Sequence, residues 1–142
     1  MTAKEYLEQA YRLDQNITSK LQQIESLRSL TQRVTVAYGV EAVSRTRNTT
    51  SLQDSIVRLM EAEEDLNRQI ASLVDLKIQI ASVISQVHNE SYRLILEKRY
   101  LCFMPWDQIA SDLSIGRRWV MIQHDRAVAV VDKLIQRQEV SL

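Results

Sequence analysis

The stretch PWDQIASDLSIGRRWVMIQHDRA, from Pro105 to Ala127, decides the fold because two short helical patterns meet within it. The first pattern carries an apolar stripe at helical spacing, made by Ile109, Ala110 and Leu113. The second carries a stripe at i, i+4 and i+7, made by Val120, His124 and Ala127. Two such faces around a tight break at residues 113–116 predict a helix-turn-helix, whose second helix can enter a DNA major groove.

Spacing alone leaves a second interpretation open, because two ordinary helices of an all-α core would show the same stripes. Pro105 suits the first helical position, since it has no N–H to leave unpaired. The small Ala110 lets the second helix cross close to the first. The face of the second helix opposite the apolar stripe carries Arg117, Arg118, Met121, Ile122 and Asp125.

The composition predicts a helical chain without a global affinity for nucleic acid. Only two glycines and one proline interrupt 142 residues, which favours an all-α fold. The formal net charge is zero, so any electrostatic attraction to DNA has to come from a local basic patch. The single Cys102 excludes an intramolecular disulfide and a multi-cysteine zinc site.

No motif in the sequence indicates catalysis, a metal site or a cofactor. His88 and His124 lie far apart without an HExxH pattern, and no phosphate loop or nucleophile elbow is present. His124 falls on the inward stripe, which favours a hydrogen-bonded core histidine over a ligand or base. We therefore expect a protein that is not an enzyme. The charged N-terminus and the absence of a long apolar run predict a cytoplasmic protein without membrane contact.

Two long amphipathic patterns precede the opening stretch. They predict helices over residues 2–36 and 52–88, joined by a polar, turn-prone and poorly ordered connection over residues 37–51. Thr2 with Glu5 and Ser51 with Asp54 have the spacing of capping boxes at the two helix starts. The domains expected are a helical hairpin over residues 1–88, with its turn near 38–51, and a C-terminal domain over residues 89–142.

Charged residues interrupt both apolar seams at matching intervals and predict how the helices pair. The residue numbers of Asp14 and Lys77 add to 91, and so do those of Arg28 and Glu63. Facing residues of an antiparallel pair have a constant sum, so this register also places Leu21 opposite Ile70. We predict a long antiparallel coiled-coil hairpin whose two opposite-charge pairs set the register, with independent exposure of these charges as the alternative.

The C-terminal part resembles region 4 of bacterial sigma factors. The resemblance rests on the runs LEKRYL at 96–101, WDQIASDLSI at 106–115, RRWV at 117–120 and HDRAV at 124–128. The whole chain is similar to a family of small phage and prophage proteins of Gram-positive bacteria, grouped with ArpU/RinA-type late transcriptional regulators. This resemblance implies a sigma region 4-like helix-turn-helix domain and a DNA-binding transcriptional regulator.

Carried over position by position, the resemblance assigns DNA contacts to the second helix. Arg117, Arg118, Met121, Ile122 and Asp125 would face the major groove, and Arg126 would meet phosphate. The chain departs from the family pattern at several positions of this segment, one of which is Gln123, where an apolar core residue is expected. Gly116 replaces the usual capping Ser or Thr, and Met121 and Ile122 replace polar or basic residues.

The expected partners are double-stranded DNA and either a second copy of the chain or RNA polymerase, held by the hairpin. Residues 88–142 carry only one net positive charge, so a monomer is expected to bind DNA weakly. The alternative from another class is a coiled-coil adaptor or assembly protein whose helix-turn-helix binds protein.

Overall fold

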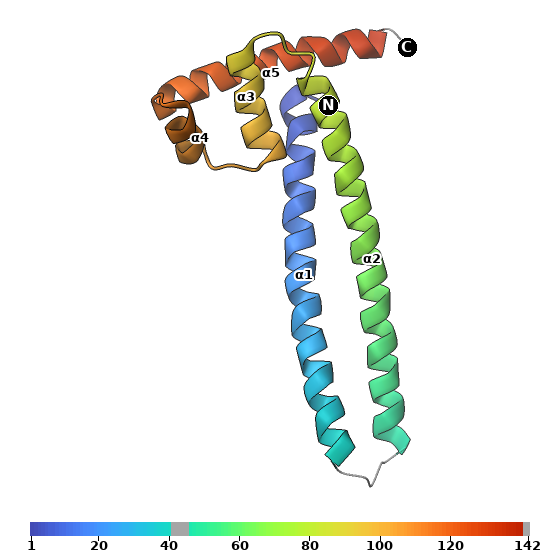
Figure 1. The fold of residues 1–142 in the computed structure, drawn as a ribbon. Helices are drawn as coiled ribbons and strands as arrows, with labels where there is room; N and C mark the ends of the chain where they lie inside the picture. Colours follow the sequence, from blue (N-terminus) through green and yellow to red (C-terminus); the bar gives the residue numbers. More distant parts are fainter. Residues whose placement is uncertain (41–45, 141–142) are drawn as a thin grey trace. The chain divides into compact units, whose positions relative to one another are not determined.

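A computed structural model describes residues 1–40 and 46–140, and over these residues the chain forms helices and no strand (Figure 1). Side chains are described for residues 1–33 and 51–138. In chain order the elements are α1 (Ala3–Val40), α2 (Thr46–Ile84), α3 (Glu90–Leu96), the π-helix η1 (Glu97–Leu101), α4 (Trp106–Leu113) and α5 (Arg117–Val140).

The helices belong to two compact units, and both long helices contribute to each. The first unit combines Met1–Leu13 with Leu73–Leu142, and the second is Asp14–Ser72.

The start of α1 follows the predicted capping box. The backbone N–H of Glu5 donates to Thr2 Oγ1 at 3.2 Å, and the N–H of Thr2 donates to Glu5 Oε2 at 3.1 Å. The two side chains thereby satisfy N–H groups that the first helical turn leaves without intrahelical partners.

The connection between the long helices is shorter than the sequence pattern predicts. Helix α1 continues to Val40 and α2 already begins at Thr46, while residues 41–45 of the predicted turn lie outside the described residues. Polar residues such as Thr, Ser and Arg cost a helix only a fraction of a kcal/mol each, and no proline interrupts this stretch. Ser51 is consequently not a cap: its carbonyl accepts a hydrogen bond from the Ser55 hydroxyl at 2.9 Å within α2.

In the second unit, α1 and α2 run side by side in opposite directions (Figure 1). Ile17, Ile24 and Leu66 are buried along their contact. Arg28 and Glu63 form an ion pair, which confirms one of the two predicted charge pairs. Leu21 and Ile70, by contrast, are 43% and 41% exposed. Two helices cover only a narrow strip of each other, so large apolar side chains of the pair can stay partly exposed.

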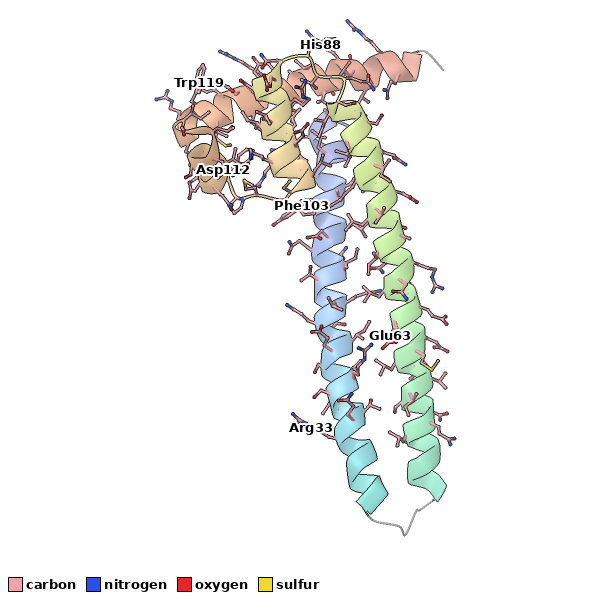
Figure 2. All side chains as sticks on the ribbon, viewed as in Figure 1. Arg33, Glu63, His88, Phe103, Asp112 and Trp119 are labelled. Carbon is pink, nitrogen blue, oxygen red and sulfur yellow. The ribbon has the colours of Figure 1, made fainter. Side chains whose placement is uncertain are left out.

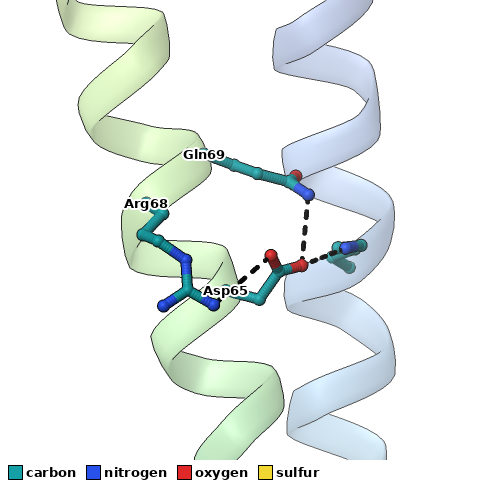
Figure 3. A network of polar contacts seen from close by, with 4 residues as sticks. Asp65, Arg68 and Gln69 are labelled. Atoms are coloured by element: carbon teal, nitrogen blue, oxygen red, sulfur yellow. Dashed lines mark hydrogen bonds and ion pairs between the residues drawn. The ribbon is translucent and has the colours of Figure 1, made fainter.

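A polar network on α2 adds a second link between the helices of this unit (Figure 3). Lys20 Nζ lies 2.5 Å from Asp65 Oδ2, and Arg68 Nη2 lies 3.8 Å from Asp65 Oδ1. The amide of Gln69 donates to Asp65 at 3.3 Å. Lys20, hydrogen-bonded to Asp65, holds the pKa of that carboxyl below its usual range.

The first unit buries apolar side chains from α1, α2, α3, α4 and α5. Its fully buried large side chains are Leu7, Ile80, Ile84, Val87, Ile95, Leu96, Ile109, Val120 and Val131. Lys77 is one partner of the other predicted charge pair and belongs to this unit. Its Nζ lies 4.5 Å from the centre of the Phe103 ring. The Lys77 ammonium thus has an aromatic partner within its own unit. Its predicted partner, Asp14, belongs to the other unit, so the pairing of Asp14 with Lys77 stays a prediction.

Candidate nucleic-acid interface

Helices α4 and α5 are joined by a tight turn that takes its shape from Ser114. Ser114 adopts the left-handed conformation, with φ 57° and ψ 38°, at the C-terminal end of α4. The chain reverses direction at this point, and the N–H of the next residue, Ile115, donates to the Ala110 carbonyl at 3.1 Å. This geometry ends an α-helix and satisfies its last carbonyl groups.

The residues on either side of α4 and at the start of α5 behave as caps. Pro105 has extended ψ of 150° and precedes the first helical residue, so it is the N-cap and not, as predicted, the first helical position. Helix assignments commonly differ by one residue at an end. Gly116 accepts the hydrogen bond of the Val120 N–H at 3.1 Å, which makes it the N-cap residue of α5.

The predicted inward stripes of both helices are confirmed. Ile109 and Ala110 of α4 form one buried cluster with Val120 of α5 and Ile95 of α3. Leu113 packs against this cluster, and His124 and Ala127 continue the buried face along α5. Burial of this stripe leaves the opposite face of α5 directed outward.

His124 is buried and hydrogen-bonded, as its place on the inward stripe predicts. Its Nε2 lies 2.6 Å from the Tyr100 hydroxyl, and its Nδ1 lies 3.4 Å from Asp125 Oδ1. The Trp106 ring meets it edge-on at 4.7 Å between centroids. Burial lowers the pKa of His124, so the neutral imidazole is favoured, accepting from Tyr100 and donating from Nδ1 toward Asp125.

Tyr100 lies in the LEKRYL run of the resemblance, but no sequence pattern assigned it a role at this site. Burial is the main cause that raises the pKa of its hydroxyl to about 12. It belongs to the π-helix η1, whose i→i+5 hydrogen bonding departs from the 3.6-residue periodicity used to find inward faces. Its partner His124 is 24 positions away, so no local motif could have paired them.

The two arginines at the start of α5 have different surroundings. Arg117 is exposed and its guanidinium lies 3.3 Å from Asp107 of α4. Arg118 is exposed, and among the described side chains it makes no ion pair or hydrogen bond. Exposed ion pairs contribute little energy, so Arg117 can exchange Asp107 for another anion at small cost.

The remaining predicted contact residues lie further along α5. Asp125 and Arg126 are exposed, Met121 is 36% exposed and Ile122 is half-buried. The Arg126 guanidinium carbon lies 5.7 Å from the centre of the Trp119 ring. Trp119 is itself 44% exposed (Figure 2). The structure therefore brings Arg117, Arg118 and Arg126 to the outer face of α5, with Trp119 among them.

A pocket of about 390 Å³ adjoins this face. Met121 and Asp125 line it together with His124 from α5, and α1, η1 and α4 supply its other walls. Within the described residues, no group of three or more His, Cys, Asp or Glu side chains is placed to hold a metal ion. None of the described helices is long and apolar enough to cross a membrane.

Comparison with known proteins identifies a family but no individual relative. The chain matches no curated protein and no solved structure. Residues 40–132 match the model of a family described as "Protein of unknown function (DUF1492)". The match covers more than half of the chain, which therefore belongs to this family.

Proposed function

We propose that this member of the DUF1492 family is a DNA-binding transcriptional regulator of the phage type. Its α4–turn–α5 segment would act as a helix-turn-helix that contacts double-stranded DNA, preceded by an antiparallel helical hairpin. The observation that carries the proposal is the left-handed turn at Ser114 between two helices that bury one face and expose Arg117 and Arg118. The resemblance to sigma-factor region 4 supports the same function.

Within the proposal, each exposed residue of α5 has a defined role. Arg117 and Arg118 would read guanine edges or hold phosphates at the entry of the groove, and Arg126 would meet the backbone. Met121 and Ile122 would offer apolar contact to thymine methyl groups. Asp125 would orient His124, whose Nδ1 lies 3.4 Å from Asp125 Oδ1.

The hairpin supplies a second part of the proposal, namely dimerisation. Within Asp14–Ser72 several large apolar side chains are between 41% and 57% exposed: Leu21, Leu27, Leu30, Val57, Met60 and Ile70. An apolar surface of this kind commonly marks a protein contact. We propose that a second copy of the chain covers it, because two heads would double the number of phosphates contacted by a weakly basic domain.

Binding to short duplexes tests the proposed function directly. Fluorescence anisotropy with labelled DNA from the gene's own promoter region is measured at low and at physiological salt. Arg117→Ala/Arg118→Ala should weaken binding by at least tenfold, since each specific arginine contact contributes about 1–3 kcal/mol. Arg33→Ala/Arg58→Ala removes the same charge from exposed positions of the other unit and should bind like the unmodified protein.

The same binding measurements distinguish the proposed regulator from a second candidate function. Trp119 and Met121 are large apolar side chains exposed on the proposed groove face, which favours a protein-binding adaptor as the second candidate. If the unmodified protein binds no DNA even at low salt, that adaptor function replaces the regulator.

Light scattering tests the proposed dimerisation through the hairpin. A dimer that Leu27→Glu/Met60→Glu converts to a monomer supports self-association. If the unmodified protein is a monomer, RNA polymerase becomes the proposed partner of the apolar surface of the hairpin.

A further inference from the structure

The pocket beside α5 combines cationic side chains from two elements with aromatic walls. Lys4 and Arg12 of α1 and Arg99 of η1 line it, together with the rings of Tyr11 and Trp106. All of these residues belong to the unit formed by Met1–Leu13 and Leu73–Leu142. None of the three cations was among the residues that the sequence patterns assigned to DNA.

Two of the cations are available to a ligand. Lys4 and Arg12 are exposed, and in the part of the chain that the structure describes neither makes a hydrogen bond or an ion pair. Arg99, by contrast, is held in place: it donates to the Met104 carbonyl at 3.1 Å and stacks 4.3 Å from the Trp106 ring.

The pocket also contains two carboxylates, which limit its positive charge. Glu8 lies four residues from both Lys4 and Arg12 on α1, so it can pair with only part of their combined charge. Asp125 is turned toward Nδ1 of His124 at 3.4 Å. The three cations outnumber the two carboxylates, one of which is already directed at a histidine. The excess positive charge of the pocket can therefore be neutralised by one small anion.

The backbone around Arg99 has an unusual conformation at this place. Arg99 and Tyr100 lie in the π-helix η1, a rare element that frequently occurs at functional sites. Phe103, two residues beyond it, has φ of 55°, which a bulky side chain rarely adopts. These two irregularities lie in the segment that carries Arg99 and Tyr100 to the pocket wall.

We propose that this pocket binds a phosphate ester, with Lys4 and Arg12 as its principal ligands and Arg99 at its inner wall. Its volume lies within the range of small-ligand sites, and arginine and lysine are the usual partners of phosphate oxygens. Met121 and Asp125 belong both to the pocket and to the proposed groove face. The phosphate can therefore come from the DNA backbone or from a free phosphate ester, and the DNA source rests on the proposed function.

The first arm of the test uses the protein without DNA. Trp119→Phe leaves Trp106 as the single tryptophan, so its fluorescence reports on the pocket. Inorganic phosphate is titrated against chloride at matched ionic strength. A saturable change that Lys4→Ala/Arg12→Ala abolishes and Arg33→Ala/Arg58→Ala retains supports the site. Circular dichroism of each variant verifies that the helices are intact.

The second arm measures the salt dependence of DNA affinity. If the backbone supplies the phosphate, Lys4→Ala/Arg12→Ala lowers the slope of log K against log salt by about one unit per lost phosphate contact. Arg33→Ala/Arg58→Ala should leave the slope unchanged. A normal slope together with saturable phosphate binding in the first arm identifies a free phosphate ester as the ligand.

The two arms also distinguish failure of this site from failure of the proposed function. If the protein binds no DNA but shows the saturable phosphate signal, the proposed function fails and the phosphate site stands. If DNA binding is normal while the phosphate signal is absent and the slope is unchanged, the phosphate site is overturned and the proposed function stands. A phosphate signal that persists in Lys4→Ala/Arg12→Ala also overturns the site.

Discussion

The hydroxyl of Tyr100 lies 2.6 Å from Nε2 of His124 and joins the π-helix η1 to the inner face of α5. Tyr100→Phe removes the donor and leaves a buried imidazole nitrogen without a partner. An unsatisfied buried polar group costs about 1–3 kcal/mol, so the free energy of unfolding should fall by that amount in urea titrations. Tyr92→Phe, at a half-buried tyrosine of α3, is the matched control, and an equal loss in both variants would contradict this role of Tyr100.

Stability should fall when the solution becomes more acidic than the ordinary pKa of histidine. Burial lowers the pKa of His124, so below about pH 6.5 the unfolded chain binds a proton that the folded chain does not. Because this proton binds to the unfolded state and not to the folded state, it favours unfolding. The free energy of unfolding is not reduced in this way above about pH 6.5. As the pH falls from 7.5 to 5, the melting temperature of His124→Gln should therefore decline less than that of the unmodified protein.

The chain has one other histidine, which provides the control. His88 is exposed, so His88→Gln should retain the decline with acid that the unmodified protein shows. The interpretation of His124 as a neutral buried group would be wrong if both variants keep the same pH dependence.

Gly116 is a position where one added side chain should stabilise the fold. Its φ is not positive, and a Cβ atom placed there has no heavy atom within 4 Å. Gly116→Ser would give α5 a side-chain cap and reduce the freedom of the unfolded chain. We expect a gain of about 0.5–1 kcal/mol in thermal or urea unfolding. A loss of stability would show that the start of α5 cannot accept a side chain.

Ser114 presents the opposite situation, since its left-handed backbone suits glycine. Ser114→Gly should raise the free energy of unfolding by about 0.5–1 kcal/mol, because glycine adopts φ of 57° without steric cost. Ser114→Val should lower stability, since a β-branched side chain tolerates this conformation poorly. Calorimetry on the two variants gives opposite shifts in melting temperature if the turn has the geometry described.

The ion pair of Arg28 and Glu63 allows a test of helix register. Arg28→Glu alone places two carboxylates together and should lower the melting temperature. Adding Glu63→Arg restores opposite charges and should recover part of the loss. Because the pair is exposed, both effects should shrink at high salt. No recovery in the double variant would mean that the two residues do not pair in solution.

The sequence predicted best where one strong physical preference acts locally. The stripe of Ile109, Val120 and Ala127 is buried as expected, because apolar residues at helical spacing have one efficient way to leave water. The capping box of Thr2 and Glu5 depends on atoms three residues apart and formed as predicted. The register of Arg28 with Glu63 could be inferred because opposite charges interrupt otherwise apolar seams.

Prediction failed where several weak preferences compete or distant residues meet. The length of the connection depended on polar residues that accept either helix or turn, and Ser51 became part of α2. Lys77 contacts the ring of Phe103, which lies 26 positions along the chain. The pocket with Lys4, Arg12 and Arg99 has no signature in any single stretch, since α1 and η1 are brought together only by the tertiary fold.

The π-helix η1 makes the length of this segment as important as its composition. An α-helix turns about 100° per residue, and the wider turn of a π-helix accommodates one residue more than an α-turn would. Deleting a single residue within Glu97–Leu101 would let the segment relax into an α-helix and change the directions of the side chains within it. Such a deletion would separate Tyr100 from His124 even though every side chain of the pair remained present. Alignments of related chains should therefore treat a one-residue gap here as a change of the site itself.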